Sequence, residues 1–373
     1  MKALGIVFSN IFTRDIPELT NVRTLASVPF AGRFRLIDFT LSNMVNSGIA
    51  TVGIITQYNY QSLMDHVGSG KNWDLSRKNG GLVILPPFNN ETGGGGVYTS
   101  RFEAIKSIES FIRHNEADVI VMSDCDIVCN FDFSEVMREH QANNADFTIV
   151  YREKDIQPTD NRSYIFVKET TDGKVTEMTD SNKNKAGNKK IYANMLVANR
   201  ALLLNLLKHH KEFGINSFSR DILFKTKEYN IYAHKLNGYY SSIDGLANYY
   251  KHSMELLDEK TRNALFYANG ADIFTKVRDS APAKFTDSAN VSNSMIADGC
   301  VIEGEVKNSI LFRGVHVAKG ARVTDSIIFQ GGSVYEGSSV NCVIMDKKAT
   351  VLEKRNLSGH YTHPYYIGKN EVI

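Results

Sequence analysis

The sequence predicts an α/β domain with a mixed, mostly parallel sheet over residues 1–257, followed by a parallel β-helix over residues 281–373. In the first part, short apolar runs alternate with segments of helical periodicity, the pattern of a sheet covered by helices. After about residue 280, aliphatic residues recur every six positions instead. A chain of 373 residues is long enough for two hydrophobic cores, and we expect residues 258–280 to link them.

The first strand–helix–strand unit spans residues 2–56. Residues 2–8 and 51–56 are short apolar runs that predict buried strands. Between them, Ile37, Leu41 and Met44 lie on one face of a predicted helix that ends before Gly48. Such a unit is the building block of a parallel sheet, since parallel strands need a crossover connection.

Residues 118–122 predict the most strongly buried strand of the chain, and Ser-Asp-Cys-Asp follows directly. Carboxylates at the carboxyl end of a central strand lie where open α/β sheets bind their ligands. Residues 101–114 predict a helix that buries one apolar face, and residues 164–178 predict a hairpin. We expect the lysine-rich stretch 180–190 and the four glycines 93–96 to be surface loops.

The six-residue period predicts one side of a triangular β-helix coil for each hexad, with the aliphatic side chain pointing inward. The aliphatic positions that carry the period are Ile296, Ile302, Leu311, Val317, Val323, Ile328, Val334 and Val340. His316 is a histidine on these coils, where we expect a surface position rather than an acyltransferase site. Residues 356–373 show no clear pattern.

Composition excludes several classes of protein. A formal charge of +2 gives no electrostatic case for a nucleic-acid partner. No apolar run reaches the roughly 18 residues of a membrane helix. The N-terminus lacks a signal-peptide layout, so we expect a cytoplasmic protein. Four scattered cysteines (Cys125, Cys129, Cys300 and Cys342) suit reduced thiols, and no zinc set is completed around them.

The segment after the first strand lacks the glycines of a phosphate-binding loop. Glycine lets the backbone approach a phosphate and adopt positive φ at little cost. Residues 9–20 contain no glycine, and Ile11 and Phe12 stand where bare backbone would be needed. The sequence therefore argues against ordinary nucleotide binding at this strand end.

Several motifs nevertheless resemble one family. Residues 34–43, 46–48, 55–58, 66–70, 73–75 and 77–87 are similar to segments of bacterial glucose-1-phosphate adenylyltransferase (ADP-glucose pyrophosphorylase). The resemblance covers nearly the whole chain. It implies a Rossmann-like nucleotidyltransferase domain followed by a left-handed β-helix. It also implies a reaction that joins glucose 1-phosphate to ATP, releases pyrophosphate and uses Mg²⁺ held by carboxylates.

The family's nucleotide-binding residues are largely replaced. Ser9, Asn10 and the residues up to Arg14 align with the Gly-Gly-x-Gly-x-Arg loop, in which only Arg14 is kept. Leu25 stands at the position of a lysine, in the segment that is Arg-Ala-Lys-Pro in the family. Residues 100–104 (Ser-Arg-Phe-Glu-Ala) align with Gly-Thr-Ala-Asp-Ala, which lines the adenine and sugar site.

The metal and sugar-phosphate positions are changed as well. Asp126 aligns with one metal-binding carboxylate, but Ser242 stands at the second, and Asp244 is expected to face elsewhere. The Glu-Lys-Pro segment of the family falls near residues 179–182 with no lysine in register, and its partner segment aligns with 192–196. We interpret Asp126 and Ser242 as a degenerate metal site. The alternative is that Asp126 is retained for a purely structural role.

The resemblance is to the regulatory, GlgD-type subunits of this family. It implies a chain with no catalytic residues and no metal of its own, which modulates a catalytic subunit that holds Mg²⁺. It further implies a hetero-tetramer or homo-oligomer and a sugar-phosphate effector. Arg33 and Arg35 are candidates for the effector anion, unless they pair with carboxylates such as Asp38. The alternatives are an active adenylyltransferase that uses Asp126 and rerouted ligands, and a stand-alone sugar-phosphate sensor.

Overall fold

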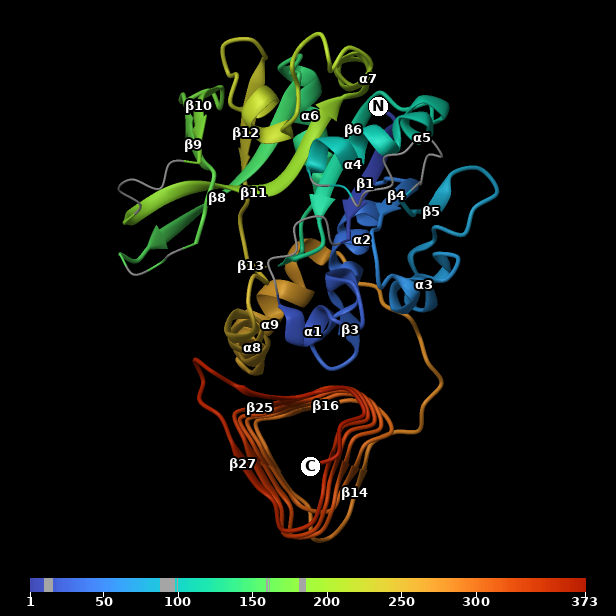
Figure 1. The fold of residues 1–373 in the computed structure, drawn as a ribbon, viewed down its shortest axis with the longest axis vertical. Helices are drawn as coiled ribbons and strands as arrows, with labels where there is room; N and C mark the ends of the chain where they lie inside the picture. The colour runs from blue at the N-terminus through green and yellow to red at the C-terminus, as the bar shows by residue number, and fades with distance from the viewer. Residues whose placement is uncertain (10–15, 88–97, 99, 159, 161, 181–185) are drawn as a thin grey trace.

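The computed structural model describes residues 1–9, 16–87, 98, 100–158, 160, 162–180 and 186–373. It has two domains, an α/β domain and a triangular β-helix that lies below it in Figure 1. The fold class expected from the sequence is therefore confirmed. No helix within the described ranges combines the length and the apolar character needed to cross a membrane.

The sheet of the first domain has the order β10-β9-β11-β6-β1-β4-β5, with β8 paired to β11 and β12 paired to β8. β6, β1, β4 and β5 run parallel, whereas β11 is antiparallel to both β6 and β8. The strands are β1 (Ala3–Phe8), β4 (Thr51–Ile55), β5 (Gly81–Leu85), β6 (Val119–Asp124), β8 (Phe147–Ile156), β9 (Phe166–Glu169), β10 (Val175–Thr179), β11 (Gly187–Asn199) and β12 (Ile231–Lys235). The predicted hairpin corresponds to β9 and β10.

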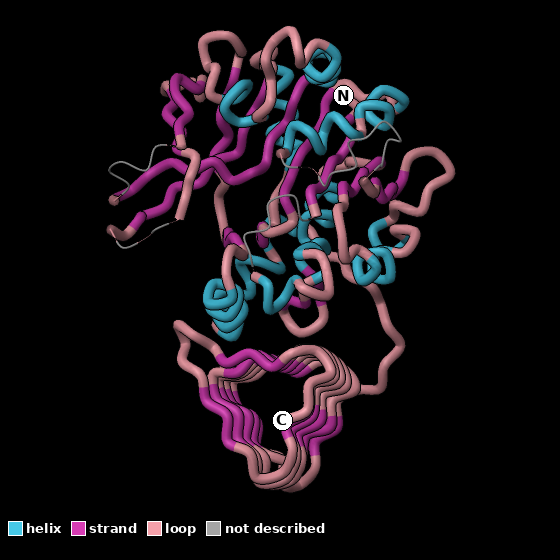
Figure 2. Tube along the Cα trace, viewed as in Figure 1, coloured by secondary structure: helices cyan, strands magenta, loops and turns pink. Residues whose placement is uncertain are grey.

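Helices cover both faces of this sheet, as Figure 2 shows. One core holds Phe102, Ile105 and Ile112 from α4 and α5, and the other holds Ile37 and Leu41 from α2. The helices of this domain are α1 (Pro17–Thr20), α2 (Leu36–Asn46), α3 (Gln61–Val67), α4 (Arg101–Ser107), α5 (Glu109–His114), α6 (Phe133–Ala142), α7 (Arg200–Lys208), α8 (Leu246–Met254) and α9 (Glu259–Phe266). The apolar faces predicted from helical spacing are therefore buried.

Two local expectations were wrong. Residues 187–190, expected in a loop, form the start of β11, where Lys190 lies opposite Glu153 and its Nζ contacts Glu169 at 2.8 Å. Cross-strand carboxylates thus make a lysine-rich strand stable. Residues 101–114 form two helices that meet at Ile108 rather than one.

The β-helix stacks three parallel sheets of five strands each within residues 284–367. Val306, Val323, Val340 and Leu357 lie in register along one side. Each of these coils advances by 17 residues, and the aliphatic side chains predicted to point inward form its core. Its strands are β14 (Lys284–Phe285), β15 (Asn290–Ser292), β16 (Met295–Ile296), β17 (Val301–Ile302), β18 (Glu305–Lys307), β19 (Ile310–Leu311), β20 (His316–Val317), β21 (Arg322–Thr324), β22 (Ile327–Ile328), β23 (Ser333–Val334), β24 (Ser339–Asn341), β25 (Val343–Met345), β26 (Thr350–Val351), β27 (Asn356–Ser358) and β28 (Tyr365–Ile367).

One corner of the coils carries a ladder of polar residues. Asn293, Asn308 and Asp325 have φ angles of 41°, 48° and 46°. Asn and Asp tolerate this left-handed conformation better than other residues that carry a side chain. Asn293 donates to Asn308 at 2.9 Å, so the ladder also joins successive coils. The tail at 356–373, which showed no pattern in the sequence, supplies β27 and β28 of the last coil.

The two domains share an apolar cluster. Phe30 and Tyr249 of the first domain pack edge to face, and Tyr249 packs in the same way on Phe329 of the β-helix. Residues 258–280, expected as a linker, begin with α9, whose Leu265 is buried in this cluster. Residues 271–283, which form no helix or strand, make the connection to the first coil.

Candidate functional site

The carboxyl ends of β1 and β6 lie side by side, with Phe8 in register with Asp124. After a bend at Cys125 and Asp126, the chain enters β7 (Ile127–Cys129), which pairs with β13 (Tyr240–Ser242). Because Ser242 lies opposite Ile127, its hydroxyl reaches the Asp126 carboxylate, with Oγ 3.3 Å from Oδ2. The structure thus brings together the two residues that the sequence had placed at one degenerate site.

A buried ion pair lies beside this pair. The Nη2 atom of Arg101 donates to both carboxylate oxygens of Asp124, at 2.7 and 2.6 Å. The two side chains are only 8% and 9% exposed. Burial is the largest single influence and lowers the pKa of Arg101, but Asp124, Tyr192 and Asp126 together raise that pKa above its ordinary value. Arg101 is therefore a fixed positive charge at the end of β6.

A cavity of about 350 Å³ opens next to these charges. Tyr192 on its wall is buried, and burial raises the pKa of its phenol, so the hydroxyl stays protonated near neutral pH. The cavity is lined by Arg101, Asp124, Asp126, Ser163, Tyr164, Ile165, Ile191, Tyr192, Asn194, Phe218 and Ser219. It has the size of a small-ligand site, at the sheet edge where such sites are common.

Of the residues aligned with the nucleotide loop and the lysine that follows it, the structure describes Ser9 and Leu25, and neither carries a charge. Ser9 is fully buried, and its carbonyl accepts bonds from Cys125 Sγ and Ala26 N, both at 3.2 Å. Leu25 and Phe102 are buried in apolar clusters. The other loop residues singled out, Asn10 and Arg14, lie outside the described residues, as do the glycines 93–96 and residues 181–185.

The strand end does not fit a Mg²⁺ ion. Magnesium prefers several carboxylate and water oxygens in octahedral geometry. Here Asp124 is engaged by Arg101, and the neighbour of Asp126 is a hydroxyl rather than a second carboxylate. Asp244 instead contacts Arg162 at 3.4 Å and accepts a bond from Asn248. Within the described residues, no group of three His, Cys, Asp or Glu side chains is placed to hold a metal ion.

Arg33 and Arg35 lie at the boundary between the domains. Nη1 of Arg35 donates to the carbonyl and hydroxyl oxygens of Ser62, at 2.6 and 3.0 Å. The guanidinium of Arg33 lies 5.1 Å from the ring centre of Phe34. Asp38 accepts the backbone N–H of Arg35 at 3.0 Å and contacts His66 at 2.6 Å. The alternative to anion binding was that the side chains of Arg33 and Arg35 pair with carboxylates such as Asp38. In the structure, the Asp38 carboxylate instead contacts His66 and the backbone N–H of Arg35.

Cationic side chains from both domains surround a small cavity of about 40 Å³, which we call the basic pocket. Burial and the nearby charges of Arg35 and Arg23 lower the pKa of Lys347 to about 7. Burial also lowers the pKa of Arg35 to about 10. The basic pocket is lined by Pro29, Gly32, Arg33, Phe34, Arg35, His66, Arg278, Phe312, Arg313, Gln330 and Lys347. An anion would relieve this repulsion between like charges.

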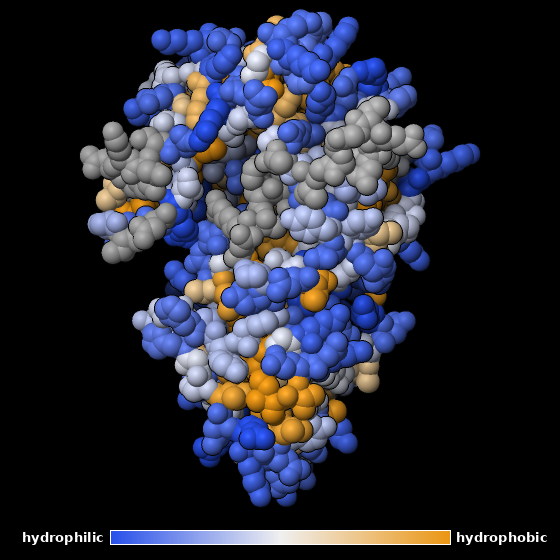
Figure 3. Space-filling view, in the orientation of Figure 1, coloured by the Kyte–Doolittle hydropathy of each residue, from blue (hydrophilic) through white to orange (hydrophobic). Residues whose placement is uncertain are grey.

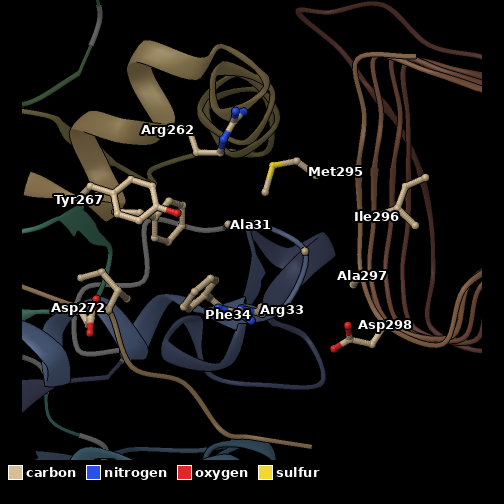
Figure 4. Close-up of a pocket in the computed structure, with 13 residues that line it drawn as sticks. Ala31, Arg33, Phe34, Arg262, Tyr267, Asp272, Met295, Ile296, Ala297 and Asp298 are labelled. Atoms are coloured by element: carbon tan, nitrogen blue, oxygen red, sulfur yellow. The ribbon is translucent and has the colours of Figure 1, made fainter. Parts of the chain in front are cut away.

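A larger cavity of about 340 Å³ adjoins it and shares Arg33 and Phe34. Figure 4 shows these two residues facing a row from Met295 to Asp298 on the β-helix, with Arg262 and Tyr267 to one side. Both cavities therefore lie between the domains. The sequence had pointed to Arg33 and Arg35 alone; Arg278, Arg313 and Lys347 were missed because they are far away along the chain.

Comparison with known proteins agrees with this architecture. The nucleotidyl transferase family matches residues 16–259, and a GlmU-like C-terminal hexapeptide family matches residues 281–359. The chain belongs to the nucleotidyl transferase family. The chain is 35% identical to "Glycogen biosynthesis protein GlgD" of Bacillus subtilis over 374 residues, which cover 100% of this chain and 97% of the relative.

Two further relatives show a similar degree of identity. GlgD of Geobacillus stearothermophilus is 36% identical over 86% of this chain and 83% of the relative. A glucose-1-phosphate adenylyltransferase of Clostridium acetobutylicum is 32% identical over 82% of this chain and 80% of the relative. The resemblance inferred from the sequence motifs is thus confirmed.

Proposed function

We propose that this chain is a catalytically impaired regulatory subunit of a hetero-oligomeric ADP-glucose pyrophosphorylase in cytoplasmic, bacterial glycogen biosynthesis. The observation that carries the proposal is the strand end itself. Arg101 engages Asp124, and Ser242 stands beside Asp126 where a second carboxylate would be needed. Full-length similarity to GlgD of Bacillus subtilis supports the assignment to glycogen biosynthesis.

The reaction of the catalytic partner explains why these changes matter. Attack of a sugar phosphate on ATP builds negative charge that Mg²⁺ and basic side chains must stabilise. Losing one such interaction typically costs about 3–4 kcal/mol of transition-state stabilisation, or two to three decades of rate. We therefore place the Mg²⁺ and the turnover in the partner subunit, and none in this chain.

The β-helix supports assembly with that partner. Exposed edge strands favour pairing with another chain. Phe285 and Val291 are exposed on the first coil, and Leu352 and Val372 near the last. Figure 3 shows hydrophobic residues gathered on the β-helix end that faces the viewer. A hetero-tetramer or a homo-oligomer would cover such surfaces.

The basic pocket supports regulation by a sugar-phosphate effector. It is lined by Arg33 and Arg35 from one domain and by Arg313 and Lys347 from the other. An anion bound there contacts both domains, so its affinity depends on how they are arranged. Such a difference in affinity is what allows an effector to shift a conformational balance.

The test is to purify this chain alone, a catalytic ADP-glucose pyrophosphorylase subunit alone, and the mixture. We expect this chain alone to form almost no ADP-glucose with Mg²⁺, to co-elute with the catalytic subunit, and to change its activity. Separate elution with unchanged activity would reject the regulatory role. Binding of a sugar phosphate without co-elution would identify a stand-alone sensor instead.

A second candidate is an active adenylyltransferase that uses Asp126 and rerouted ligands. The cavity of about 350 Å³ beside Asp126 favours it, since its size suits a small ligand. The assay of this chain alone decides between the two: robust ADP-glucose formation that is lost in D126N supports the second candidate and rejects the first.

A further inference from the structure

Several neighbouring groups fix the position of the Arg101 guanidinium at the end of β6. Arg101 is the first residue of α4, and the preceding Ser100 caps that helix by accepting the N–H of Glu103 at 3.2 Å. The guanidinium lies over the ring of Phe8, 4.6 Å from its centre. Phe8 is in turn in register with Asp124 on the neighbouring strand. Helix, ring and carboxylate thus hold the guanidinium at the strand end.

The burial of the pair makes each charge depend on the other. With 8% and 9% of their side chains exposed, Arg101 and Asp124 have given up most of their hydration. A buried charge is stable only when its partner compensates it. The Asp124 carboxylate therefore needs a cation, and both of its oxygens accept bonds from one guanidinium nitrogen.

A divalent cation at this strand end would compete for the same oxygens. Asp124 and Asp126 supply the carboxylates that line the cavity here, and hard cations bind through such oxygens. A metal ion would also be repelled by the guanidinium on Asp124. We propose that Arg101 is a built-in counter-ion that takes the place of a divalent metal at the end of β6, so that Mg²⁺ is excluded until this arginine is removed.

This inference concerns one chain and needs no partner subunit, so it stands or falls separately from the proposed regulation. The probe is Mn²⁺, followed by electron paramagnetic resonance and by titration calorimetry. We expect the wild-type chain to show no saturable site up to about 10 mM metal. R101Q should gain one site with at least a tenfold tighter dissociation constant, and R101Q/S242D should bind more tightly again.

Two matched variants control for charge. R113Q removes a charge from an exposed ion pair with Glu109 on the neighbouring α5, and should behave as the wild type. R101K keeps a positive charge at the site and should still exclude Mn²⁺. Equal binding by the wild-type chain and R101Q would overturn the proposal, as would a folded R101Q that binds no metal.

The thermal stability of R101Q provides a second readout. Removing the guanidinium takes away the cation that contacts both oxygens of Asp124, so we expect Tm to fall without metal and to recover on addition of Mn²⁺. If R101Q is unfolded without metal, recovery of the fold with Mn²⁺ supports the proposal and failure to recover counts against it. R101Q/D124N, which has a neutral pair, should fold without metal and show no response to Mn²⁺.

Discussion

Arg23 and Asp346 form a buried ion pair across the boundary between the two domains. Nη2 of Arg23 lies 2.8 and 2.9 Å from the two carboxylate oxygens, and the side chains are 2% and 0% exposed. Tyr366 of the β-helix also donates to Asp346, at 2.7 Å. Arg23 belongs to the segment that follows the altered nucleotide loop, so this pair fastens that segment to the β-helix.

Breaking this pair should destabilise the protein. In D346N the Arg23 guanidinium stays buried without its counter-charge, which typically costs about 3–5 kcal/mol. We expect D346N to unfold at a lower concentration of denaturant than the wild type. E305Q breaks the exposed contact between Glu305 and Arg322 and should change the free energy of unfolding by less than about 1 kcal/mol. Equal free energies of unfolding for D346N and the wild type would show that the ion pair between Arg23 and Asp346 does not stabilise the protein.

Anion binding at the basic pocket should depend on side chains from both domains. We expect inorganic phosphate and glucose 1-phosphate to raise the Tm of the wild-type chain. R33Q and K347Q should each weaken binding about tenfold or more, since a hydrogen bond between charged groups contributes about 1.5–3 kcal/mol. The matched control is K284Q, at an exposed lysine on the first coil. If K284Q weakens binding as much as K347Q, the effect comes from net charge alone.

The lowered pKa of Lys347 should appear in the pH dependence of stability. Its pKa is about 7 in the folded chain against an ordinary value of 10.5, because burial and the charges of Arg35 and Arg23 disfavour its protonation. Between these values the unfolded chain binds more protons, so stability rises with pH from about 7 to 10.5, by at most about 1.4 kcal/mol per unit.

The variant K347M removes this contribution, and its stability should rise less steeply with pH over the same interval than that of the wild type. K348M changes the exposed neighbour and should keep the slope of the wild type. Chemical denaturation at a series of pH values measures both slopes. Parallel curves for K347M and the wild type would show that Lys347 titrates normally.

The β-helix should not tolerate a side chain at Gly304. A Cβ atom there would lie 2.4 Å from the carbonyl oxygen of Ala321 and 2.6 Å from that of Ala318, and neither backbone oxygen can move freely. We expect G304A to destabilise the coils by about 1–3 kcal/mol or more. G245A, where a Cβ meets open space, is the control. Thermal unfolding followed by circular dichroism compares the two, and an unchanged Tm in G304A would contradict the expectation.

Local patterns in the sequence were sufficient for most of the architecture. Helical spacing placed Ile37 and Leu41 in one core, and the six-residue period placed Val317 and Val334 inside the β-helix. A helix buries every third or fourth residue and a β-helix buries every sixth, so both produce a periodic pattern of apolar residues in the sequence. The strand at 187–190 was missed, since its lysines are stabilised by carboxylates on other strands.

The candidate site was only partly predictable. Alignment with family motifs brought Asp126 and Ser242 together, and the pairing of β7 with β13 agrees with that placement. The contact of Arg101 with Asp124 was not foreseen, because periodicity marked the helix containing Arg101 as a core element and said nothing of the direction of its first side chain.

By itself, the sequence determined the order of the two domains, the apolar faces of their elements and the absence of glycine from residues 9–20. Only the tertiary structure decided which charges meet. Arg23 and Asp346 are 323 residues apart, and Ser242 and Asp126 are 116 apart. Such pairs leave no periodic signal in the sequence. They depend on where separately folded elements come to lie, and burial then makes a close counter-charge a condition of stability.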